Sequence, residues 1–374
     1  MPPMTTHPQT PQLRRLHLSL FEGCDLACRG CLAQPLENRS EGGPALSADL
    51  AMGAVAEARP LGLDSVHLIG SETLLHPELG ALLDGLEREK LSLVIETSGV
   101  GVTTDLALRL ARIPRCTVAI GLDGAVSETH DAIHNQPGAF QTAAEAASLL
   151  AGNGVTLHLV YTVLRANAAQ LPPFIRLAEG LGAEAVRFGM AIPGPRFTPS
   201  GGKIVTAGLS KWQRHLRVEE LIALGRRVER QMAPNTRLQL LYNQPPAFRG
   251  LHPQSRYEDW ARCGALNVLG VLPTGQYTLC GAGQHMPELV LGQVGQDALA
   301  NVWECHPALR RLREGMPGRL EGVCGHCVMR SSCMGNCVAE NYMRTGSFFG
   351  PYWFCEAAER AGLFPAGRLE ETFF

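Results

Sequence analysis

Three cysteines lie within eight residues near the start of the chain, in the stretch CDLACRGC. They are Cys24, Cys28 and Cys31, in the spacing C-x3-C-x2-C, and they follow an apolar run at 13–20. Thiolates bind iron–sulfur clusters, usually one thiolate to each iron, and a cubane has four irons. Three thiolates therefore leave one iron open, where a small molecule can chelate. The alternative is a zinc or redox site, but a structural zinc site needs a fourth Cys or His nearby.

Seven further cysteines form a second pattern between residues 263 and 355. Their order is Cys-x11-Gly-x4-Cys, then C-x2-C-x5-C-x3-C, then a single cysteine. The members are Cys263, Cys280, Cys324, Cys327, Cys333, Cys337 and Cys355. Turns are frequent here and regular elements few, so the pattern predicts a separate module that metal organises. A zinc-ribbon-like site is the alternative for the C-x2-C start, although seven is an odd number of ligands for it.

The composition limits the partners and the compartment that we expect. The chain has 374 residues, 45% of them hydrophobic and 18% charged, and a formal net charge of -2. This balance favours one large or two modest globular domains, and it predicts neither a nucleic-acid nor a membrane partner. The sequence has no run of about 18 apolar residues and no apolar signal-peptide core, so we expect a cytoplasmic protein. Thiols stay reduced there, which favours metal ligands or catalytic thiols over disulfides.

Alternating strands and helices should position the first cysteine group. Apolar runs of strand length alternate with segments of helical period, which predicts a parallel sheet covered by helices. The six predicted strands are 13–20, 64–70, 91–97, 116–124, 155–164 and 183–192. Ser47 is a predicted N-cap, and Gly62, Gly154 and Gly182 fall where helices should end. Six such units form either part of a (β/α) barrel or a doubly wound sheet, and both gather ligands at the carboxyl ends of the strands.

Changes in composition, element pattern and cysteine content divide the chain into four segments. We expect a flexible tail at 1–12, the β/α units at 13–190, a bridging segment at 191–255 and the cysteine-rich module at 256–374. The bridge contains a predicted helix at 210–232. Only about a dozen residues precede the first strand, so we expect no fused N-terminal recognition domain.

The C-x3-C-x2-C loop directly after the first strand resembles that of the radical S-adenosylmethionine (SAM) enzymes. The resemblance implies an α/β fold with a partial (β/α)6 TIM-like barrel. It also implies that the three cysteines of the loop are catalytic and hold a [4Fe-4S] cluster, whose open iron binds the amino and carboxylate groups of SAM.

Further stretches resemble the SAM contacts of that family. GSET at 70–73 is similar to its Gly-Gly-Glu-Pro motif, ETSG at 96–99 to its Thr-Asn-Gly, and GLDG at 121–124 to its Ser-Leu-Asp-Gly. The second and fourth residues of the first motif differ, and Gly121 replaces a serine. The resemblance implies SAM contacts from Ser71, Glu72, Thr97, Asp123, Asn167 and Arg196. The alternatives are a helix N-cap for Asp123 and Asn167 and a surface position for Arg196.

The second cysteine pattern resembles the SPASM domain, which carries two auxiliary [4Fe-4S] clusters. The resemblance implies that Cys324, Cys327, Cys333 and Cys355 hold one cluster. It implies that Cys263, Cys280 and Cys337 hold the other, with one iron open or bound by a different residue type. Two cysteines remain. We expect Cys116 to be an inert core thiol, whereas Cys305 is a buried helix residue, the missing ligand or a hydrogen-atom donor.

The resemblance implies an oxidoreductase that cleaves SAM reductively to a 5'-deoxyadenosyl radical. The expected substrate is a residue of a ribosomally synthesised peptide, which is crosslinked, oxidised or epimerised. A low-potential electron donor such as flavodoxin or ferredoxin is implied, together with a separate leader-peptide-binding protein. The alternatives are a tetrapyrrole or quinone-cofactor precursor as substrate, a sulfatase-maturase-like enzyme, and a non-catalytic iron–sulfur or zinc protein.

Overall fold

One curved sheet organises the chain. The computed structural model describes residues 11–22, 24, 26, 28, 43–191, 196–197, 203–204, 215–250 and 263–370. Within these residues, ten strands form one sheet in the order β12-β11-β10-β1-β2-β3-β4-β5-β6-β9. The strands are β1 (Arg15–Ser19), β2 (Ser65–Ile69), β3 (Ser92–Thr97), β4 (Cys116–Gly121), β5 (Thr156–Val163), β6 (Ala185–Met190), β9 (Gln239–Tyr242), β10 (Val268–Val271), β11 (Gln276–Thr278) and β12 (Val290–Gln293). The pairs from β10 to β9 are parallel, while β11 and β12 are antiparallel additions.

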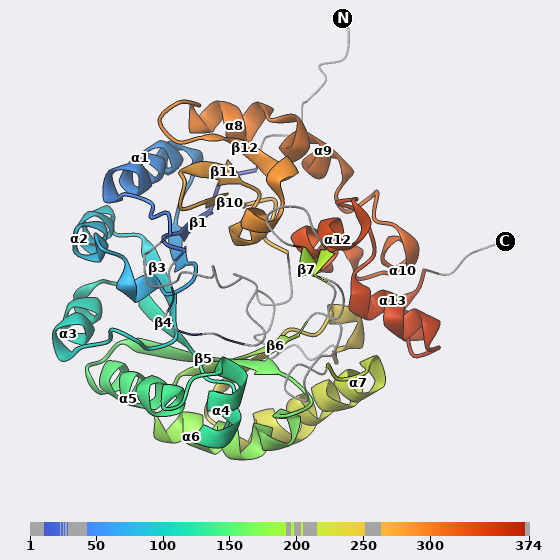
Figure 1. Ribbon diagram of the computed structural model, residues 1–374. Helices are drawn as coiled ribbons and strands as arrows, with labels where there is room; N and C mark the ends of the chain where they lie inside the picture. Colours follow the sequence, from blue (N-terminus) through green and yellow to red (C-terminus); the bar gives the residue numbers. More distant parts are fainter. Residues whose placement is uncertain are drawn as a thin grey trace, which may run out of the picture.

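The sheet curves around an interior, with the helices of the β/α units on its outer side (Figure 1). These helices are α1 (Ala48–Ala58), α2 (Leu79–Glu89), α3 (Thr104–Arg112), α4 (Ser127–His134), α5 (Ala139–Gly152), α6 (Leu171–Gly180) and α7 (Val218–Arg227). The partial barrel that the resemblance implies is therefore confirmed, and the doubly wound sheet that the pattern left open is not formed. Residues 210–214 of the predicted helix at 210–232 lie outside the described residues; in the rest, α7 begins at Val218 and a π-helical turn continues it from Val228 to Met232.

The strands follow the period-two rule of a sheet with two different faces. In β5, Leu157, Leu159 and Tyr161 are fully buried, while the residues between them are only partly buried. Because the helices cover one face, the other residues face the barrel interior. They include His158, whose Nδ1 accepts a hydrogen bond from Arg187 Nε at 3.1 Å. The interior is therefore polar, whereas the layer between sheet and helices is apolar.

Local signals in the sequence fix where the helices begin and end. The Ser47 side chain accepts from Leu50 N–H and caps α1. Gly62, Gly154 and Gly182 have φ values of 105°, 83° and 80°, in the left-handed region that favours glycine. These four predictions are confirmed.

Strands from the bridging segment and from the cysteine-rich part join the sheet of the β/α units. β10 lies beside β1 as a parallel strand, and its four residues Val268 to Val271 are buried. β9, from the bridging segment, lies beside β6 at the other end of the parallel strands. Both therefore extend the sheet of the β/α units, because the apolar edges of β1 and β6 would otherwise stay unpaired. The predicted boundaries at 190 and 255 remain sequence divisions that the sheet crosses.

Short helices follow β12, as the red and orange end of Figure 1 shows. They are α8 (Leu299–Cys305), α9 (Pro307–Gly315), α10 (Gly322–Gly325), α11 (Arg330–Cys333), α12 (Val338–Thr345) and α13 (Trp353–Arg360). The prediction of a buried Cys305 is wrong, because this residue ends α8 and is exposed. Cys116 is buried at the start of β4, as predicted, and burial raises its pKa to about 12.

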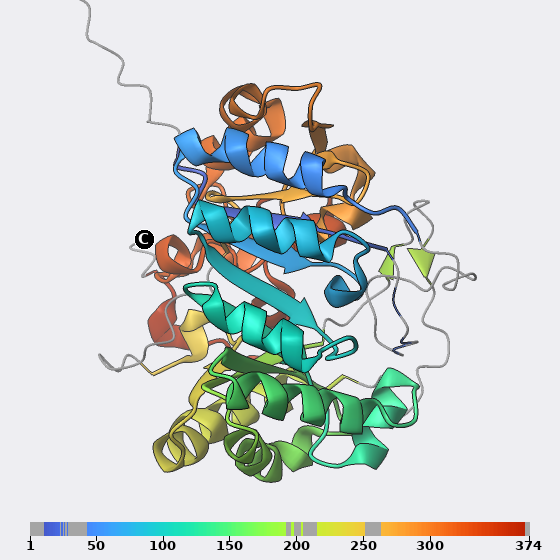
Figure 2. The ribbon, with the colours of Figure 1, turned by 90° about the vertical axis from the view of Figure 1, so that its left-hand side faces the viewer.

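Side on, the β7–β8 hairpin lies on the side of the carboxyl ends of the parallel strands (Figure 2). β7 (Arg196–Phe197) and β8 (Lys203–Ile204) pair antiparallel. None of the described helices is long and apolar enough to cross a membrane.

Candidate functional site

Glu72 lies at the centre of a hydrogen-bond web at the ends of β2 and β3. Its side chain is completely buried. One carboxylate oxygen accepts from Thr97 Oγ1 at 2.5 Å and from Leu74 N–H at 3.1 Å. The other accepts from Ser98, through its N–H at 2.8 Å and its hydroxyl at 2.5 Å. The structure therefore brings Glu72 and Thr97, both predicted site residues, together. Hydroxyl and N–H donors surround the carboxylate, as burial of a charged group requires.

A tight turn after β2 holds this web against β1. Gly70 has a φ of 134°, and a Cβ there would lie 3.1 Å from the carbonyl oxygen of Phe21. The next residue, Ser71, donates its N–H to that same carbonyl at 3.3 Å. One buried polar atom beside the web, Thr73 Oγ1, has no hydrogen-bond partner among the described residues. It leaves hydrogen-bonding capacity next to Glu72, although Ser71 itself contributes only its backbone.

A chain of side chains joins the first cysteine loop to the end of β4. Cys28 Sγ lies 3.3 Å from Nδ1 of His134, and Nε2 of the same ring lies 3.1 Å from an Asp123 carboxylate oxygen. Asp123 and His134 are both buried. Burial opposes the protonation of His134, but its hydrogen bonds to Asp123 and Cys28 raise its pKa to about 10. A protonated ring then donates to both partners.

Asp123 is itself held from two sides. Its second carboxylate oxygen accepts from Thr162 N–H at 2.5 Å, and its own N–H donates to His130 Nδ1 at 3.0 Å. The rings of His130 and His134 stack with centroids 4.0 Å apart. Burial and the neighbouring His134 lower the pKa of His130 to about 4, which keeps that ring neutral and its Nδ1 an acceptor. Asp123 is thus not a helix N-cap.

Asn167 joins the ends of β4 and β5. Its side-chain amide donates to the carbonyls of Asp123 at 3.0 Å and Thr162 at 2.8 Å, and its Oδ1 accepts from Leu164 N–H at 2.8 Å. The side chain is fully buried and makes no cap to the following turn. The alternative of an N-cap is therefore wrong, and the amide supports the backbone on which Asp123 sits. Gly121, at the end of β4, has open space where a Cβ would stand.

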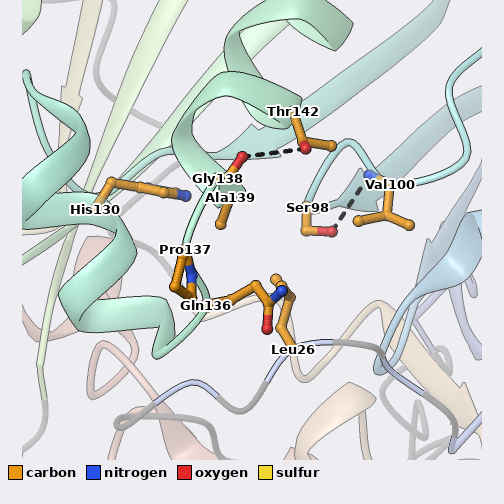
Figure 3. A pocket seen from close by; sticks show the side chains of 9 residues that line it. All are labelled: Leu26, Ser98, Val100, His130, Gln136, Pro137, Gly138, Ala139 and Thr142. Carbon is orange, nitrogen blue, oxygen red and sulfur yellow. Dashed lines mark hydrogen bonds between the residues drawn. The ribbon is translucent and has the colours of Figure 1, made fainter.

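A cavity of about 270 Å³ lies beside this group of residues (Figure 3). Leu26, from the cysteine loop, is on one side, and Ser98, which also binds Glu72, is on another. The remaining lining residues come from the β3 end and from the segment that includes α4 and the start of α5. The loop, the acid web and the His130 ring thus meet around one hollow.

The first cysteine loop is described only in part. Cys24 and Cys28 are half-buried, and the Cys24 sulfur accepts from Leu26 N–H at 3.4 Å. Cys31 lies outside the described residues, and so does the side chain of Arg196.

The later cysteines fall into two groups in space. The first contains Cys324, Cys327, Cys333 and Cys355, each of which interacts electrostatically with others of the group. The second contains Cys263, Cys280 and Cys337, which interact in the same way. Backbone N–H groups donate to the sulfurs of Cys263, Cys324 and Cys327 at 3.4 Å each. Cys263 also interacts with Cys333 of the first group, so the two groups adjoin, and their assignment to two clusters stays a prediction.

Burial makes these thiols costly to ionise without a positive partner. It raises the pKa of Cys280 to about 11 and that of Cys333 to about 12, and it also raises that of Cys263. In the part of the chain that is described, no three Cys, His, Asp or Glu side chains converge on one ion position. Ligands of a cubane stand at the corners of a larger body than one ion, so the looser groups fit an iron–sulfur cluster.

Three residues near the predicted site were not predicted from the sequence: Ser98, His130 and His134. His130 and His134 are four residues apart, a spacing that places both on one face of a helix. This spacing is the sequence feature from which the two histidines could have been predicted. Ser98 lies inside the ETSG stretch, where only its threonine was assigned.

Comparison with known proteins supports this arrangement. Residues 18–178 match the radical SAM superfamily. The mycofactocin maturase MftC of Mycobacterium tuberculosis (strain H37Rv) is 29% identical to this chain over 338 residues, which are 89% of this chain and 80% of MftC. The AdoMet-dependent heme synthase of Oleidesulfovibrio alaskensis is 26% identical over 367 residues, covering 94% of this chain and 89% of that enzyme.

The fold is also that of a solved enzyme. SuiB of Streptococcus suis, crystallised with S-adenosylmethionine, superposes with a TM-score of 0.72 at 16% identity, covering 93% of this chain and 78% of SuiB. SuiB bound to its precursor peptide SuiA gives 0.71 at 17% identity, with 93% and 76% covered. The fold is therefore shared along nearly the whole chain, including the cysteine-rich part.

Proposed function

This chain carries a radical SAM domain, and from that premise we propose that it modifies a residue of a ribosomally synthesised peptide by hydrogen-atom abstraction. The buried web around Glu72 supports the SAM site of this proposal most directly, because it places a carboxylate for the SAM ammonium beside the cysteine loop at the carboxyl ends of the strands. Crosslinking, oxidation and epimerisation are all open outcomes for the peptide.

Cys24, Cys28 and Cys31 would hold the SAM-binding [4Fe-4S] cluster. When bound, this cluster supplies one electron to the SAM sulfonium, which splits into methionine and a 5'-deoxyadenosyl radical. The chain's own residues position and shield the reactants. Glu72 would accept the SAM ammonium in exchange for the Ser98 and Thr97 hydroxyls, which can rotate toward other acceptors. Asp123 and Asn167 would hold the β4 and β5 ends around the nucleoside, in the open space beside Gly121.

The second cysteine pattern would hold two auxiliary [4Fe-4S] clusters. Cys324, Cys327, Cys333 and Cys355 supply four sulfurs to one, and Cys263, Cys280 and Cys337 supply three to the other. The two spatial groups support this division, as do the backbone N–H donors that face the sulfurs. The buried thiols also need the positive charge that iron provides.

The peptide substrate is supported by two relatives. MftC is named a maturase, and SuiB has been crystallised with its precursor peptide. We extend this to the partners: a flavodoxin or ferredoxin would supply the electron in the cytoplasm, and a separate protein would bind the leader peptide. Arg196, the first residue of β7, would be a further SAM contact.

Mass spectrometry tests the peptide substrate. The protein is reconstituted anaerobically with iron and sulfide, then incubated with SAM, dithionite and each small peptide encoded near its gene. A mass change that depends on SAM and on this chain supports the proposal. Formation of 5'-deoxyadenosine with none of the peptides altered would contradict it.

A tetrapyrrole substrate is the second candidate, because the AdoMet-dependent heme synthase aligns with 94% of this chain. The same incubation with a porphyrinoid that carries propionate side chains separates the two. Loss of mass from the porphyrinoid, with the peptides unchanged, would favour this candidate.

A further inference from the structure

We propose that His134 is a positioning residue for the SAM-binding cluster: held by Asp123, its imidazole hydrogen-bonds the Cys28 sulfur and makes the cluster easier to reduce. This rests on the proposed function, in which Cys28 is an iron ligand. Hydrogen bonds to the sulfurs are among the features that set the reduction potential of iron–sulfur clusters, since they stabilise the more negative, reduced state.

The geometry places His134 between two acceptors. Nδ1 lies 3.3 Å from Cys28 Sγ and Nε2 lies 3.1 Å from Asp123 Oδ2, so each ring nitrogen has one partner. A thiolate and a carboxylate accept hydrogen bonds but do not donate them. The ring is 8% exposed, so water competes little for either contact.

The surroundings fix the orientation of the ring. Asp123 is held by Thr162 N–H on one side and by the Asn167 amide on its carbonyl. His130 stacks on His134 and accepts from the Asp123 N–H through Nδ1. The nitrogen that faces Cys28 is therefore set by contacts that do not involve the cysteine loop, which is what a preorganised donor requires.

The order Cys28, His134, Asp123 is also that of a nucleophile, a base and the group that orients the base. The two roles exclude each other, because a sulfur bound to iron is not a free nucleophile. We assign the ligand role, since Cys28 is the second cysteine of the C-x3-C-x2-C loop. Alkylation of Cys28 by iodoacetamide in the fully reconstituted chain would show a free thiol and overturn the inference.

Potentiometric titration followed by electron paramagnetic resonance tests the effect on the cluster. The signal to follow is the one that changes when SAM is added, which separates this cluster from the auxiliary ones. The variants are His134→Phe, which removes the donor, His134→Asn, which keeps an amide donor, and Glu128→Gln, on the exposed side of the same helix, as the control. We expect a more negative midpoint potential for His134→Phe, a smaller shift for His134→Asn, and a wild-type value for Glu128→Gln.

Each result decides the inference. An unchanged potential in His134→Phe at full iron content would overturn it and leave the proposed function intact. If His134→Phe loses this cluster, His134→Ala decides, because it removes the donor without adding a ring, and an unchanged potential at full iron content would then overturn the inference. A wild-type chain with no SAM-responsive signal would overturn the proposed function and this inference together.

A different observation concerns the cluster with only three cysteines. Glu340, in the first turn of α12, is 4% exposed, and its Oε1 has no hydrogen-bond partner among the described residues. Its N–H donates to the sulfur of Cys337, which immediately precedes α12. An unpaired buried carboxylate is costly. We infer that Glu340 supplies the fourth ligand of the Cys263, Cys280 and Cys337 cluster.

Mössbauer spectroscopy of 57Fe-reconstituted protein tests this assignment, which also rests on the proposed auxiliary clusters. We expect Glu340→Ala to change the spectrum of one iron site, and Glu340→Cys to keep the wild-type iron content. Glu314→Gln, an exposed carboxylate of α9, serves as the control. A wild-type spectrum for Glu340→Ala would overturn the assignment, whereas wild-type protein with no auxiliary iron would overturn the proposed clusters themselves.

Discussion

Ser98 donates both its backbone N–H and its hydroxyl to the same carboxylate oxygen of Glu72, at 2.8 and 2.5 Å. The backbone bond has a fixed direction, whereas the hydroxyl can turn away. Glu72 therefore combines a permanent anchor with donors that a bound ammonium can replace. This is the arrangement expected of a carboxylate that binds its ligand without moving.

Replacing Glu72 with Gln should weaken SAM binding at least tenfold, the equivalent of about 1.4 kcal/mol. The amide loses the charge, and its NH2 group would face a donor wherever it points, either Ser98 N–H or Leu74 N–H. Equilibrium binding of SAM to the reconstituted protein measures the effect. The control is Glu89→Gln, because Glu89 is a half-buried carboxylate that pairs with Arg59; this variant should bind SAM with wild-type affinity. Wild-type affinity in Glu72→Gln would remove this residue from the SAM site.

Replacing Cys24, Cys28 and Cys31 together with Ala should remove about four irons per chain and all SAM cleavage. The loop would then have no thiolate for the first cluster, while the later cysteines stay intact. Iron analysis and chromatography of 5'-deoxyadenosine measure both quantities. Cleavage that persists in the triple variant would refute the assignment of the loop.

Replacing Cys327 with Ala should lower the auxiliary iron and stop product formation, while SAM cleavage persists. Cys327 belongs to the group with Cys324, Cys333 and Cys355, which is separate from the first loop. Wild-type protein should hold about twelve irons and twelve sulfides per chain if all three sites carry cubanes. About four irons together with zinc would instead make the cysteine-rich part structural, and so would full iron and activity in Cys327→Ala.

The β/α units could be predicted because their signal is local. Each strand and helix between 13 and 190 carries its own apolar period and its own cap, such as Ser47 or Gly154. The strand β10 could not be predicted in this way, because its four residues are too few to show a period. Its partner β1 lies about 250 residues earlier, and only tertiary pairing identifies it.

The site shows the same division between local and distant information. Cysteine spacing is local, so the two sets of later cysteines follow from the sequence resemblance. The contact between Cys28 and His134 joins residues 106 positions apart. Nothing in the α4 sequence shows which face of that helix meets the cysteine loop. The spacing of His130 and His134 was the only sequence feature that pointed to this contact.

Replacing His158 with Asn should make the fold less sensitive to acid. Burial and the adjacent Arg187 guanidinium lower the pKa of His158 from 6.5 to about 4. Between these two values the unfolded chain takes up a proton that the folded chain does not, so stability falls as the pH drops from 6.5 toward 4. This one group contributes a loss of about 1 kcal/mol between pH 7.5 and 5.5. Asparagine keeps an acceptor for Arg187 and does not titrate.

Anaerobic urea unfolding of the reconstituted protein at the two pH values measures this loss. The difference between the two unfolding free energies should be smaller in His158→Asn than in wild type. Thr156→Val changes the same inner face of β5 without altering a titratable group, so it should keep the wild-type difference. If His158→Asn loses as much stability as wild type over this range, His158 is already charged in the folded protein. The polar barrel interior would then hold a second positive charge beside Arg187.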